Sequence, residues 1–566
     1  EARTATGHVE HLVERPAHHD PAAALELDQH QLELGAVTVD GVPADVSRGE
    51  DRLLVALPAG PGPFWVRVAF TARDPAKGLI FVPGGAGETA MAWTQGAMED
   101  HSWWFPCFDT PNNLSTFRVA VRHRSGVQAV ANGVRTARDD HGDGWTTTVH
   151  EQRQPMVLYL LNVAVGDFVA VDDGGGPVPM THWLPRTRAS EAATFRATGF
   201  ALRWLSAETS VPYAWPRYGH VAVHRFPWGG MENTTLTTIT DRALVDDAVI
   251  AREDVDADRL IIHEAVHQWF GDLLTMKGWS DIWLNESFAT WLEARCTAAW
   301  RAQGDAQREA DELARELWHN REAYLGEDSG RYRRALVTNR WDDAYELFDR
   351  VAYEKGSLVL HHLGCVLGAE RLRAAVRLYT RRHAHDLVGT DDWRQALEDA
   401  TGEPLDWFFD QWVFRPGHPE LTVTWRHEPG RGQLIVEIEQ TQAKDADTTW
   451  RLPTRLAWAA AEGVATRDVV LENPRETLVI PCPSAPAWCC LDPAGDLPAV
   501  LTEIGFLTNP QEHQRLINPA YRELLAEGIA RGVNAYAQQL RSGADLGAPP
   551  QVTAQAPPRV ADGGRR

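Results

Sequence analysis

Apolar and polar positions alternate through the first 183 residues with the period of two that is typical of half-buried strands. Turn signals such as Asp-Gly and Gly-Pro-Gly separate these runs. The clearest runs are LELGAVTVDG (32–41), RLLVALP (52–58), FWVRVAFTA (64–72), TFRVAVRH (116–123) and TTTVHEQ (146–152). The pattern predicts an N-terminal β-sheet domain over residues 1–183.

From residue 184 to residue 417 the apolar positions recur every three or four residues, as they do on one face of a helix. The segments that show this best are DADRLIIHEAVHQWFGDLL (256–274), SFATWLEARCTAAWRA (287–302), DAQREADELARELWHNREAYL (305–325) and GSLVLHHLGCVLG (356–368). We therefore expect a mostly helical domain here. Alternation returns over residues 418–495, for example in LTVTWRHE (421–428), and predicts a small antiparallel β-sandwich.

The last part of the chain consists of two segments with different patterns. Residues 496–541 predict a strand followed by a helix, a short α/β segment whose helix lies in NPAYRELLAEGIARGVNAYAQQL (518–540). Residues 542–566 are rich in Pro, Gly and Ala, and we expect them to be disordered. A chain of 566 residues, 44% of them hydrophobic, exceeds the size of one core, so the predicted fold class is multidomain α+β.

Charge and cysteine usage narrow the possible partners. The formal net charge is −23 and no basic stripe occurs, so we expect no nucleic-acid partner. No apolar run reaches membrane-spanning length, and we expect no membrane partner. The six cysteines form no CxxC pair, which is typical of free thiols in a reducing compartment. We predict a cytoplasmic protein, with secretion as the alternative because the sequence does not begin with Met.

The first candidate for chemistry is IHEAVH (262–267). Two histidines four residues apart, His263 and His267, lie on one face of a helix and are able to bind the same ion. A catalytic zinc ion needs a third protein ligand and an open position for water. Glu264 points away from the pair, where its carboxylate is placed to take a proton from that water. The alternative is an ordinary helix with two surface histidines.

The third ligand is predicted from DIWLNESFATWLEA (281–294), in which Glu286 follows His267 by nineteen residues. A second helix packed on the first would bring Glu286 to the metal as an oxygen ligand. Glu293, two turns further along, would accept a hydrogen bond from a ligand histidine and fix its tautomer. The alternative for Glu286 is a helix N-terminal acid, which the helix dipole favours. Because HExxH lies upstream, we predict the ligand role.

The stretch HEAVHQWFGDLLTMKGWSDIWLNESFATWLEA (263–294) resembles the gluzincin aminopeptidases, the group of aminopeptidase N and leukotriene hydrolase. Their pattern is HExxH followed by eighteen residues and a Glu. The resemblance implies a thermolysin-like catalytic domain over residues 184–417. It also implies one Zn²⁺ per chain, held by His263, His267 and Glu286, with Glu264 as the general base.

A second stretch, FPWGGMENTTLTT (226–238), is similar to the GxMEN motif of the same family. The resemblance implies a strand that lines the substrate and is formed by Gly229, Gly230, Met231, Glu232 and Asn233. Glu232 would then hold the free amino group of the substrate by a charge-assisted hydrogen bond. Outside this context, a turn of that composition is unremarkable.

A third stretch, VAYEKGSLVLHHL (351–363), resembles the YxKG segment of the family. It implies that Tyr353 donates a hydrogen bond to the oxyanion of the reaction, whereas a lone tyrosine is more often a core residue. WTQGAMEDHSWWFPCFDTPNN (93–113) is similar to an element of the N-terminal domain, and WFFDQWVFRPGHPEL (407–421) to the end of the catalytic domain. The resemblance thus covers residues 22–495.

The segment 93–113 departs from the family pattern. Family members carry an acidic or amide residue two positions after the Gln of TQ, but here Gln95, an expected substrate-binding residue, is followed by Gly96 and Ala97. Either Glu232 holds the amino terminus alone, or Glu99 or Gln95 contributes. We expect weaker binding of the amine, by about 1–3 kcal/mol. From the resemblance we also expect that this sequence starts inside the first domain of the family and does not include the large helical domain that usually follows.

The segment DLPAVLTEIGFLTNPQEHQRLINPAYRELLAEGIARGVNAYAQQL (496–540) resembles the last strand and helix of zinc-dependent N-acetylmuramoyl-L-alanine amidases. Glu503 corresponds to the catalytic Glu of their ExGF motif. That site also needs upstream ligands, including a DPGHGG-like segment that this sequence lacks, so we expect Glu503 to be structural. If the strand were unpaired, it would be prone to association.

Together these patterns predict a zinc aminopeptidase that acts on peptides with a free N-terminus. One alternative is an epoxide hydrolase or a bifunctional relative, because the same zinc polarises an epoxide. A second is an inactive binding scaffold. A third, suggested by residues 496–541 alone, is a protein related to the cell-wall amidases.

Overall fold

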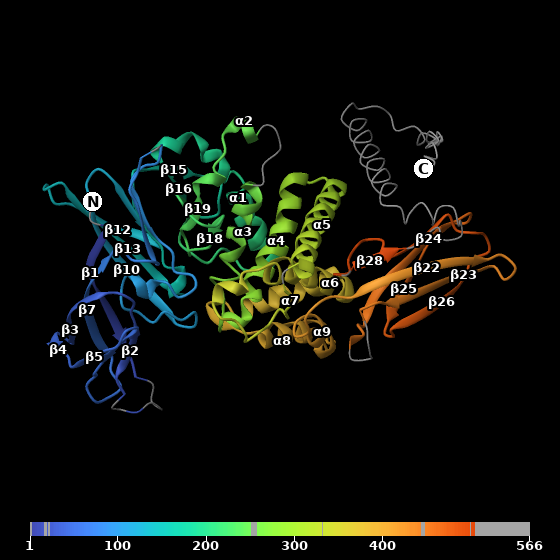
Figure 1. The fold of residues 1–566 in the computed structure, drawn as a ribbon. Coiled ribbons are helices and arrows are strands. Elements are labelled where there is room, and N and C mark those ends of the chain that lie inside the picture. The colour runs from blue at the N-terminus through green and yellow to red at the C-terminus, as the bar shows by residue number, and fades with distance from the viewer. Residues whose placement is uncertain are drawn as a thin grey trace, which may run out of the picture.

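The computed structural model describes residues 3–15, 20, 23–85, 87–250, 257–330, 332–442, 448–498 and 500–503. Three parts follow one another in chain order (Figure 1): N-terminal β-sheets, a helical region that includes a mixed sheet, and C-terminal β-sheets. The multidomain α+β fold agrees with the class predicted from the apolar periodicity. Within the described residues, no helix combines the length and the apolar character needed to cross a membrane.

The N-terminal part consists of strands that form four sheets, in the orders β1-β7-β3-β4, β2-β6-β5, β8-β9-β14-β11 and β10-β13-β12. Their bounds are β1 (Thr4–Val13), β2 (Leu25–Asp28), β3 (Glu33–Val39), β4 (Val42–Pro43), β5 (Val46–Arg48), β6 (Arg52–Val55), β7 (Phe64–Arg73), β8 (Leu79–Val82), β9 (Met91–Thr94), β10 (Leu114–Arg124), β11 (Gln128–Ala131), β12 (Val134–Asp140), β13 (Trp145–Val157) and β14 (Val163–Gly166).

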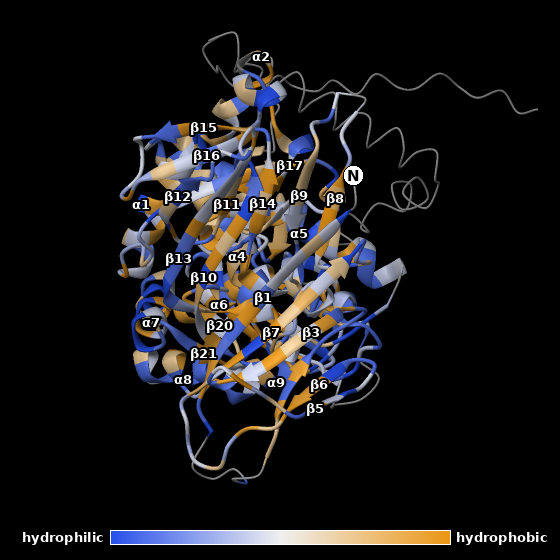
Figure 2. Cartoon of the chain, turned by 90° about the vertical axis from the view of Figure 1, so that its left-hand side faces the viewer, coloured by the Kyte–Doolittle hydropathy of each residue, from blue (hydrophilic) through white to orange (hydrophobic). Residues whose placement is uncertain are grey.

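Strand β7 shows how the alternating pattern builds these sheets. Every second side chain from Phe64 to Ala72 is buried, and β1 and β3 pair with β7 in antiparallel register on its two sides. Val66 and Val68 pack with Leu27 in one apolar cluster, and burying each such side chain contributes about 1.5–3 kcal/mol. Figure 2 shows hydrophobic and hydrophilic residues following one another along the strands of this part.

The middle part combines helices with short strands. Its strands are β15 (Phe168–Asp173), β16 (Met180–Pro185), β17 (Tyr218–Val223), β18 (Gly230–Met231), β19 (Thr237–Thr240), β20 (Leu274–Met276) and β21 (Asp386–Val388). Its helices are α1 (Thr198–Thr209), α2 (Asp247–Ile250), α3 (Ala257–His267), α4 (Trp283–Ala302), α5 (Ala306–Gly330), α6 (Gly356–Leu367), α7 (Ala369–Arg382), α8 (Thr390–Thr401) and α9 (Asp406–Trp412).

One sheet, in the order β15-β16-β17-β19-β18, crosses the predicted boundary at residue 183. Strand β16 pairs in parallel with β17, and β17 in parallel with β19, so β15 and β16 belong to the same sheet as the strands of the helical region. The period of two in these strands resembles that of the preceding domain, and the sequence pattern therefore does not separate them. The short strand β18 lies at the edge of this sheet.

Helix α4 lies in the interior of the helical region. It contacts α3, α5 and α6, and nearly all of its side chains from Trp283 to Ala298 are buried. A helix enclosed in this way holds its side chains in fixed positions, because interiors are close-packed. The carboxylates of Glu286 and Glu293 are thus placed by a well-buried helix.

The C-terminal part contains two sheets, β26-β23-β22-β28 and β25-β24-β27. Apolar residues of both sheets, among them Val436 and Leu456, belong to one core cluster. The strand bounds are β22 (Glu420–Glu428), β23 (Gln433–Gln440), β24 (Leu452–Ala460), β25 (Gly463–Leu471), β26 (Arg475–Pro481), β27 (Trp488–Leu491) and β28 (Val500–Glu503).

Strand β28 is the beginning of the amidase-like segment, and it is paired. It runs parallel to β22, with Glu420 opposite Val500 and Val423 opposite Glu503. The unpaired strand considered from the sequence is therefore not found, because the edge of β22 accepts it. The predicted helix over 518–540 and the predicted disordered tail over 542–566 lie outside the described residues.

Candidate metal centre

Helix α3 carries the HExxH motif and ends at its last histidine. Asp258 lies in its first turn, where the helix dipole favours an acid, and it accepts a hydrogen bond from Arg196 at 2.6 Å. The sequence pattern extended the helix to residue 274, but α3 ends at His267. The chain turns at Gly271, whose φ of +132° suits glycine, and a Cβ there would lie 3.2 Å from His267 Nδ1.

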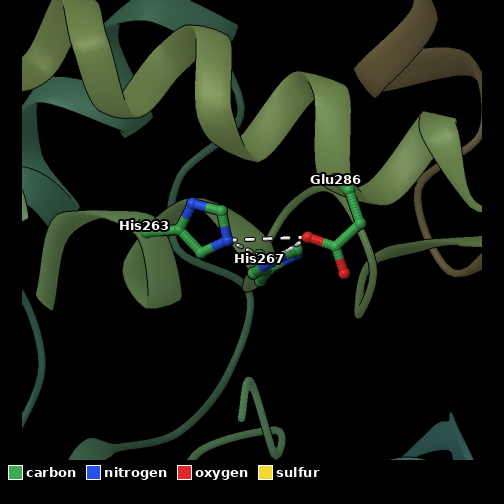
Figure 3. A group of neighbouring side chains, drawn as sticks. All are labelled: His263, His267 and Glu286. Atoms are coloured by element: carbon green, nitrogen blue, oxygen red, sulfur yellow. Dashed lines mark hydrogen bonds and ion pairs between the residues drawn. The ribbon is translucent and has the colours of Figure 1, made fainter. Parts of the chain in front are cut away.

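The structure brings His263, His267 and Glu286 together in a largely buried triangle (Figure 3), in which the His263 side chain keeps 14% of its exposure. The two Nε2 atoms lie 3.1 Å apart. Glu286 Oε2, which reaches down from α4, lies 3.5 Å from His263 Nε2 and 3.3 Å from His267 Nε2. Ligand atoms bound tetrahedrally to zinc at about 2.0–2.1 Å are separated by about 3.3 Å. The triangle therefore has the dimensions of three corners of a zinc site.

The hydrogen bonds around the two histidines decide which nitrogens face the centre. His263 Nδ1 donates to Glu293 Oε2 at 3.0 Å, and His267 Nδ1 donates to the Phe270 carbonyl at 2.9 Å. A neutral imidazole whose Nδ1 carries the proton presents a lone pair on Nε2. Two such lone pairs and a carboxylate oxygen point to one place, and this donor set fits zinc.

Burial and charge also favour a cation at this place. Burial lowers the pKa of His267, but Glu232 and Glu286 outweigh it and raise the value to about 9. Burial raises the pKa of Glu286, but His267 and His263 lower it to about 2. The carboxylates thus favour positive charge at this place. A divalent ion bound at the triangle supplies that charge.

Glu293 orients the first histidine through a larger network. Its Oε1 accepts a hydrogen bond from Arg259 Nε at 2.8 Å, and Arg259 also contacts Glu316 Oε2 at 3.0 Å. Both carboxylates are buried. The network holds the carboxylate, which in turn holds the His263 ring in the orientation that presents Nε2.

Changing Glu293 to Gln is expected to weaken zinc binding by roughly 10- to 100-fold, because the amide is a weaker acceptor for His263 Nδ1–H. The measurement is competition for zinc against a chelator of known affinity. Glu309→Gln, an exposed change on α5, is the matched control and should leave the affinity as it is. Equal zinc affinities of the Glu293 variant and the native protein would contradict the assignment.

Glu264 lies beside the triangle and against the GGMEN segment. Its Oε2 is buried and has no hydrogen-bond partner among the described residues. Burial raises its pKa to about 8, against the lowering effect of His263 and His267. A Cβ on Gly230 would lie 2.2 Å from Glu264 Oε1, so only glycine at this position lets the edge strand approach the carboxylate.

The GGMEN segment contains β18, which pairs with β19 through Gly230 opposite Ile239 and Met231 opposite Thr238. Glu232 follows the strand and is buried. The Asn233 amide is engaged within the protein, since it donates to the Leu160 carbonyl at 3.3 Å and accepts from Thr238 Oγ1 at 2.8 Å. Its side chain thus fixes the turn, while the predicted contact with substrate stays a prediction.

Tyr159 and Asn285 were not predicted from the sequence, although both belong to the site. The Tyr159 hydroxyl lies 3.5 Å from Glu232 Oε1, and Asn285 Nδ2 donates to that hydroxyl at 3.1 Å. Asn285 directly precedes Glu286 in the chain, and this position next to a predicted ligand is the sequence feature that could have identified it. Tyr159 lies in an apolar run (VLYLLN), and no sequence feature there indicates a functional residue.

Tyr353 lies on a short π-helical turn, Val351–Lys355, that leads into α6. Its ring is stacked over His263, with 6.0 Å between the ring centroids and 12° between the planes. Burial, followed by the Glu286, Glu232 and Glu264 carboxylates, raises its pKa well above the usual value. The phenol therefore stays protonated at neutral pH, while the predicted donation to the oxyanion stays a prediction.

Residues 95–99 follow β9, and they differ in whether their polar groups have hydrogen-bond partners. The Gln95 amide is buried, and neither of its polar atoms has a partner among the described residues. Ala97 is buried, and its carbonyl is bound by the Tyr345 hydroxyl. Glu99 accepts a hydrogen bond from Trp279 Nε1 at 2.8 Å. Among the alternatives left open by the sequence, Gln95 thus has polar atoms that are buried and have no partner among the described residues.

Comparison with known families finds three matches along the chain. The Peptidase M1 N-terminal domain matches residues 5–160, and the Peptidase family M1 domain matches residues 194–412. Residues 489–535 match the N-acetylmuramoyl-L-alanine amidase family. The first two matches contain every residue of the site described above.

Comparison with individual proteins points to the same group. The chain is 28% identical over 425 residues to Aminopeptidase M1-A of Oryza sativa subsp. japonica, 26% over 365 residues to Glutamyl aminopeptidase of Mus musculus and 31% over 348 residues to Alanine/arginine aminopeptidase of Saccharomyces cerevisiae. These alignments cover 71%, 63% and 60% of this chain but only 46%, 38% and 39% of the relatives. The chain thus spans less than half the length of each.

The fold is similar to a crystal structure of Legionella pneumophila aminopeptidase A in complex with aspartic acid, with a TM-score of 0.70 and 18% identity. The superposition covers 85% of this chain and 55% of that one.

Proposed function

The chain belongs to peptidase family M1, and from this premise we propose that it is a zinc-dependent aminopeptidase, which releases the N-terminal residue of a peptide. The observation that carries the proposal is the largely buried triangle of His263, His267 and Glu286, with the Glu232 carboxylate beside it. The triangle supports a metal ion, and Glu232 supports a charged amino group. A zinc aminopeptidase uses both, because the metal acts on the scissile carbonyl and the carboxylate holds the free amino group.

We also propose how the helical region and the C-terminal sheets are to be classified. The helical region, in which α3 and α4 supply the metal ligands, is thermolysin-like. The two C-terminal sheets form a sandwich, which the core cluster shared by their apolar faces supports. The segment that follows begins with β28, which pairs with β22.

When bound, zinc supplies Lewis acidity that polarises a carbonyl and lowers the pKa of water. Glu264 accepts the proton of the attacking water, since its carboxylate is buried beside the triangle and has an unpartnered oxygen. It then passes this proton to the leaving amine. The two proton transfers thus use one carboxylate, that of Glu264.

Glu232 and Tyr353 act on opposite sides of the scissile bond. Glu232 binds the substrate ammonium, so that the peptide bond after the first residue is the one that is cleaved. Tyr353 donates to the oxyanion that develops on the carbonyl, because its raised pKa keeps the proton on the phenol. The open edge of β18 offers backbone groups to an extended peptide.

Hydrolysis of aminoacyl anilides tests the proposal. A panel with acidic, basic and apolar side chains, measured with and without a chelator, is expected to give chelator-sensitive hydrolysis of at least one member. The N-acetylated form of that member is the control, and we expect it to be inert because Glu232 has no ammonium to bind. An epoxide substrate covers the alternative chemistry. Equal rates for the free and the acetylated anilide would contradict an aminopeptidase.

Introducing a carboxylate at the Ala97 position is expected to tighten substrate binding. Ala97→Glu adds a partner for the ammonium, and a charge-assisted contact of about 1–3 kcal/mol corresponds to a KM lower by roughly 5- to 150-fold. Ala97→Met, which adds similar bulk without an acceptor, separates charge from size. The idea that this position limits amine binding is wrong if KM for an aminoacyl anilide stays the same in Ala97→Glu.

A further inference from the structure

A second group of metal-binding side chains lies far from the triangle in the chain, between α6 and the turn that follows β27. His361 and Cys365 are one helical turn apart on α6 and face Asp496 in the turn. One nitrogen, one sulfur and one oxygen atom of the three side chains lie within 4.8 Å of one another. Among the described residues, this group and the triangle are the ones with such geometry.

The turn is held in place by contacts that do not involve the Asp496 carboxylate. The Asp492 side chain accepts the backbone N–H groups of Asp496 and Leu497, both at 3.0 Å. Arg321, from α5, donates to the carbonyl groups of Gly495 at 2.5 Å and Leu497 at 3.1 Å. The backbone on both sides of Asp496 is therefore fixed before any ion binds, as a preorganised site requires.

The donor set matches one class of ion. A thiolate and a carboxylate carry two negative charges and the imidazole is neutral, so together they balance a divalent cation. Thiolate and imidazole ligands favour zinc over magnesium or calcium. His361 Nε2 lies 3.3 Å from Asp496 Oδ1, and two ligands at about 2.0–2.1 Å in a tetrahedral zinc site are also about 3.3 Å apart.

We propose that His361, Cys365 and Asp496 bind a second zinc ion, which joins α6 to the turn of residues 492–497. Cys365 is exposed, and the His361 and Asp496 side chains retain 20% and 32% of their exposure. Solvent therefore reaches the site and supplies the fourth ligand. Arg455, a cation near Cys365, is paired with Asp468 at 2.8 Å, which reduces its repulsion of a bound ion.

The second zinc has a structural role. Tyr353 precedes His361 by eight residues in one continuous helical run, a separation of roughly 12 Å along the helix axis. The ion is thus too far from the reacting atoms to take part in turnover, and it ties the helix to the C-terminal sheets. Binding to the folded state alone stabilises that state, so zinc should raise Tm through this site.

Cobalt substitution tests the proposal independently of activity. The triangle contains no sulfur, so a thiolate-to-cobalt charge-transfer band in the near ultraviolet reports on the second site alone. We expect the band in the native chain and in His263→Ala, and its loss in Cys365→Ser. Cys490→Ser, which removes a thiol of β27, is the matched control and should keep the band. The band is measured without substrate, so it tests the second site even if the protein does not hydrolyse aminoacyl anilides.

Zinc content gives the second readout. Native protein is expected to bind two zinc ions per chain, whereas Cys365→Ser and Asp496→Asn each bind one. Zinc should raise the Tm of these two variants less than that of the native protein, because only the triangle still binds it, and His263→Ala should keep the rise that the second site contributes. Asp496→Asn keeps the backbone contacts of the turn, so it reports on the ligand rather than on folding. A native chain without the cobalt band, a band that persists in Cys365→Ser, or equal zinc content in native and variant protein would overturn the proposal.

Discussion

Glu264→Gln is expected to lower kcat by roughly 100- to 10,000-fold, which is the range for loss of a positioned general acid–base group. The amide has the shape of the carboxylate but neither accepts the proton of water nor returns it to the leaving amine. Glu264 is not a corner of the triangle, so the variant should keep the metal content of the native protein. The measurements are kcat on an aminoacyl anilide and zinc per chain.

The comparison with Glu264→Asp sharpens this result. Aspartate keeps the acid but withdraws it by one methylene from its place against Gly230, so partial activity is expected to return. Substantial turnover by Glu264→Gln with zinc bound would remove Glu264 from the mechanism. Loss of zinc from that variant would instead show that the carboxylate is needed to hold the metal.

Tyr353→Phe is expected to lower kcat by roughly 100- to 1,000-fold, with a much smaller change in KM. Removing one donor to a developing oxyanion has an effect of this size, and the ground-state peptide does not need that donor. The stacking of the ring on His263 is retained in the variant. Steady-state kinetics that resolve kcat from KM provide the measurement.

The matched control is Tyr379→Phe, which removes a buried hydroxyl that has no partner among the described residues. It should leave kcat unchanged, and it shows what loss of a phenol does when no reaction depends on it. A fall in kcat/KM of Tyr353→Phe that arises from KM alone would mean that Tyr353 binds substrate without stabilising the oxyanion.

The ligand set was predictable because its spacing is set by helix geometry. His263 and His267 lie on one face of α3, and the nineteen residues to Glu286 give the chain room to turn at Gly271 and return as α4. The end of α3 at His267 was not predictable from periodicity, because the apolar residues after it continue the helical pattern. They pack in the core from a turn instead.

Contacts between segments that lie far apart in the sequence could not be predicted from the hydrophobic pattern. Tyr159 reaches Glu232 from the N-terminal part, and nothing in its apolar surroundings marks it. His361 and Asp496 are 135 residues apart and meet only because the C-terminal sheets place the turn on α6. The pairing of β28 with β22 depends in the same way on which sheet edge is free.

Removal and return of zinc test the central claim most directly. Protein stripped of metal by a chelator, and then freed of the chelator, is expected to hydrolyse no aminoacyl anilide and to regain its activity on addition of zinc. His267→Ala, in which one corner of the triangle is missing, should regain none. Full activity of the metal-free protein, or recovery of His267→Ala with zinc, would contradict a zinc site built from His263, His267 and Glu286.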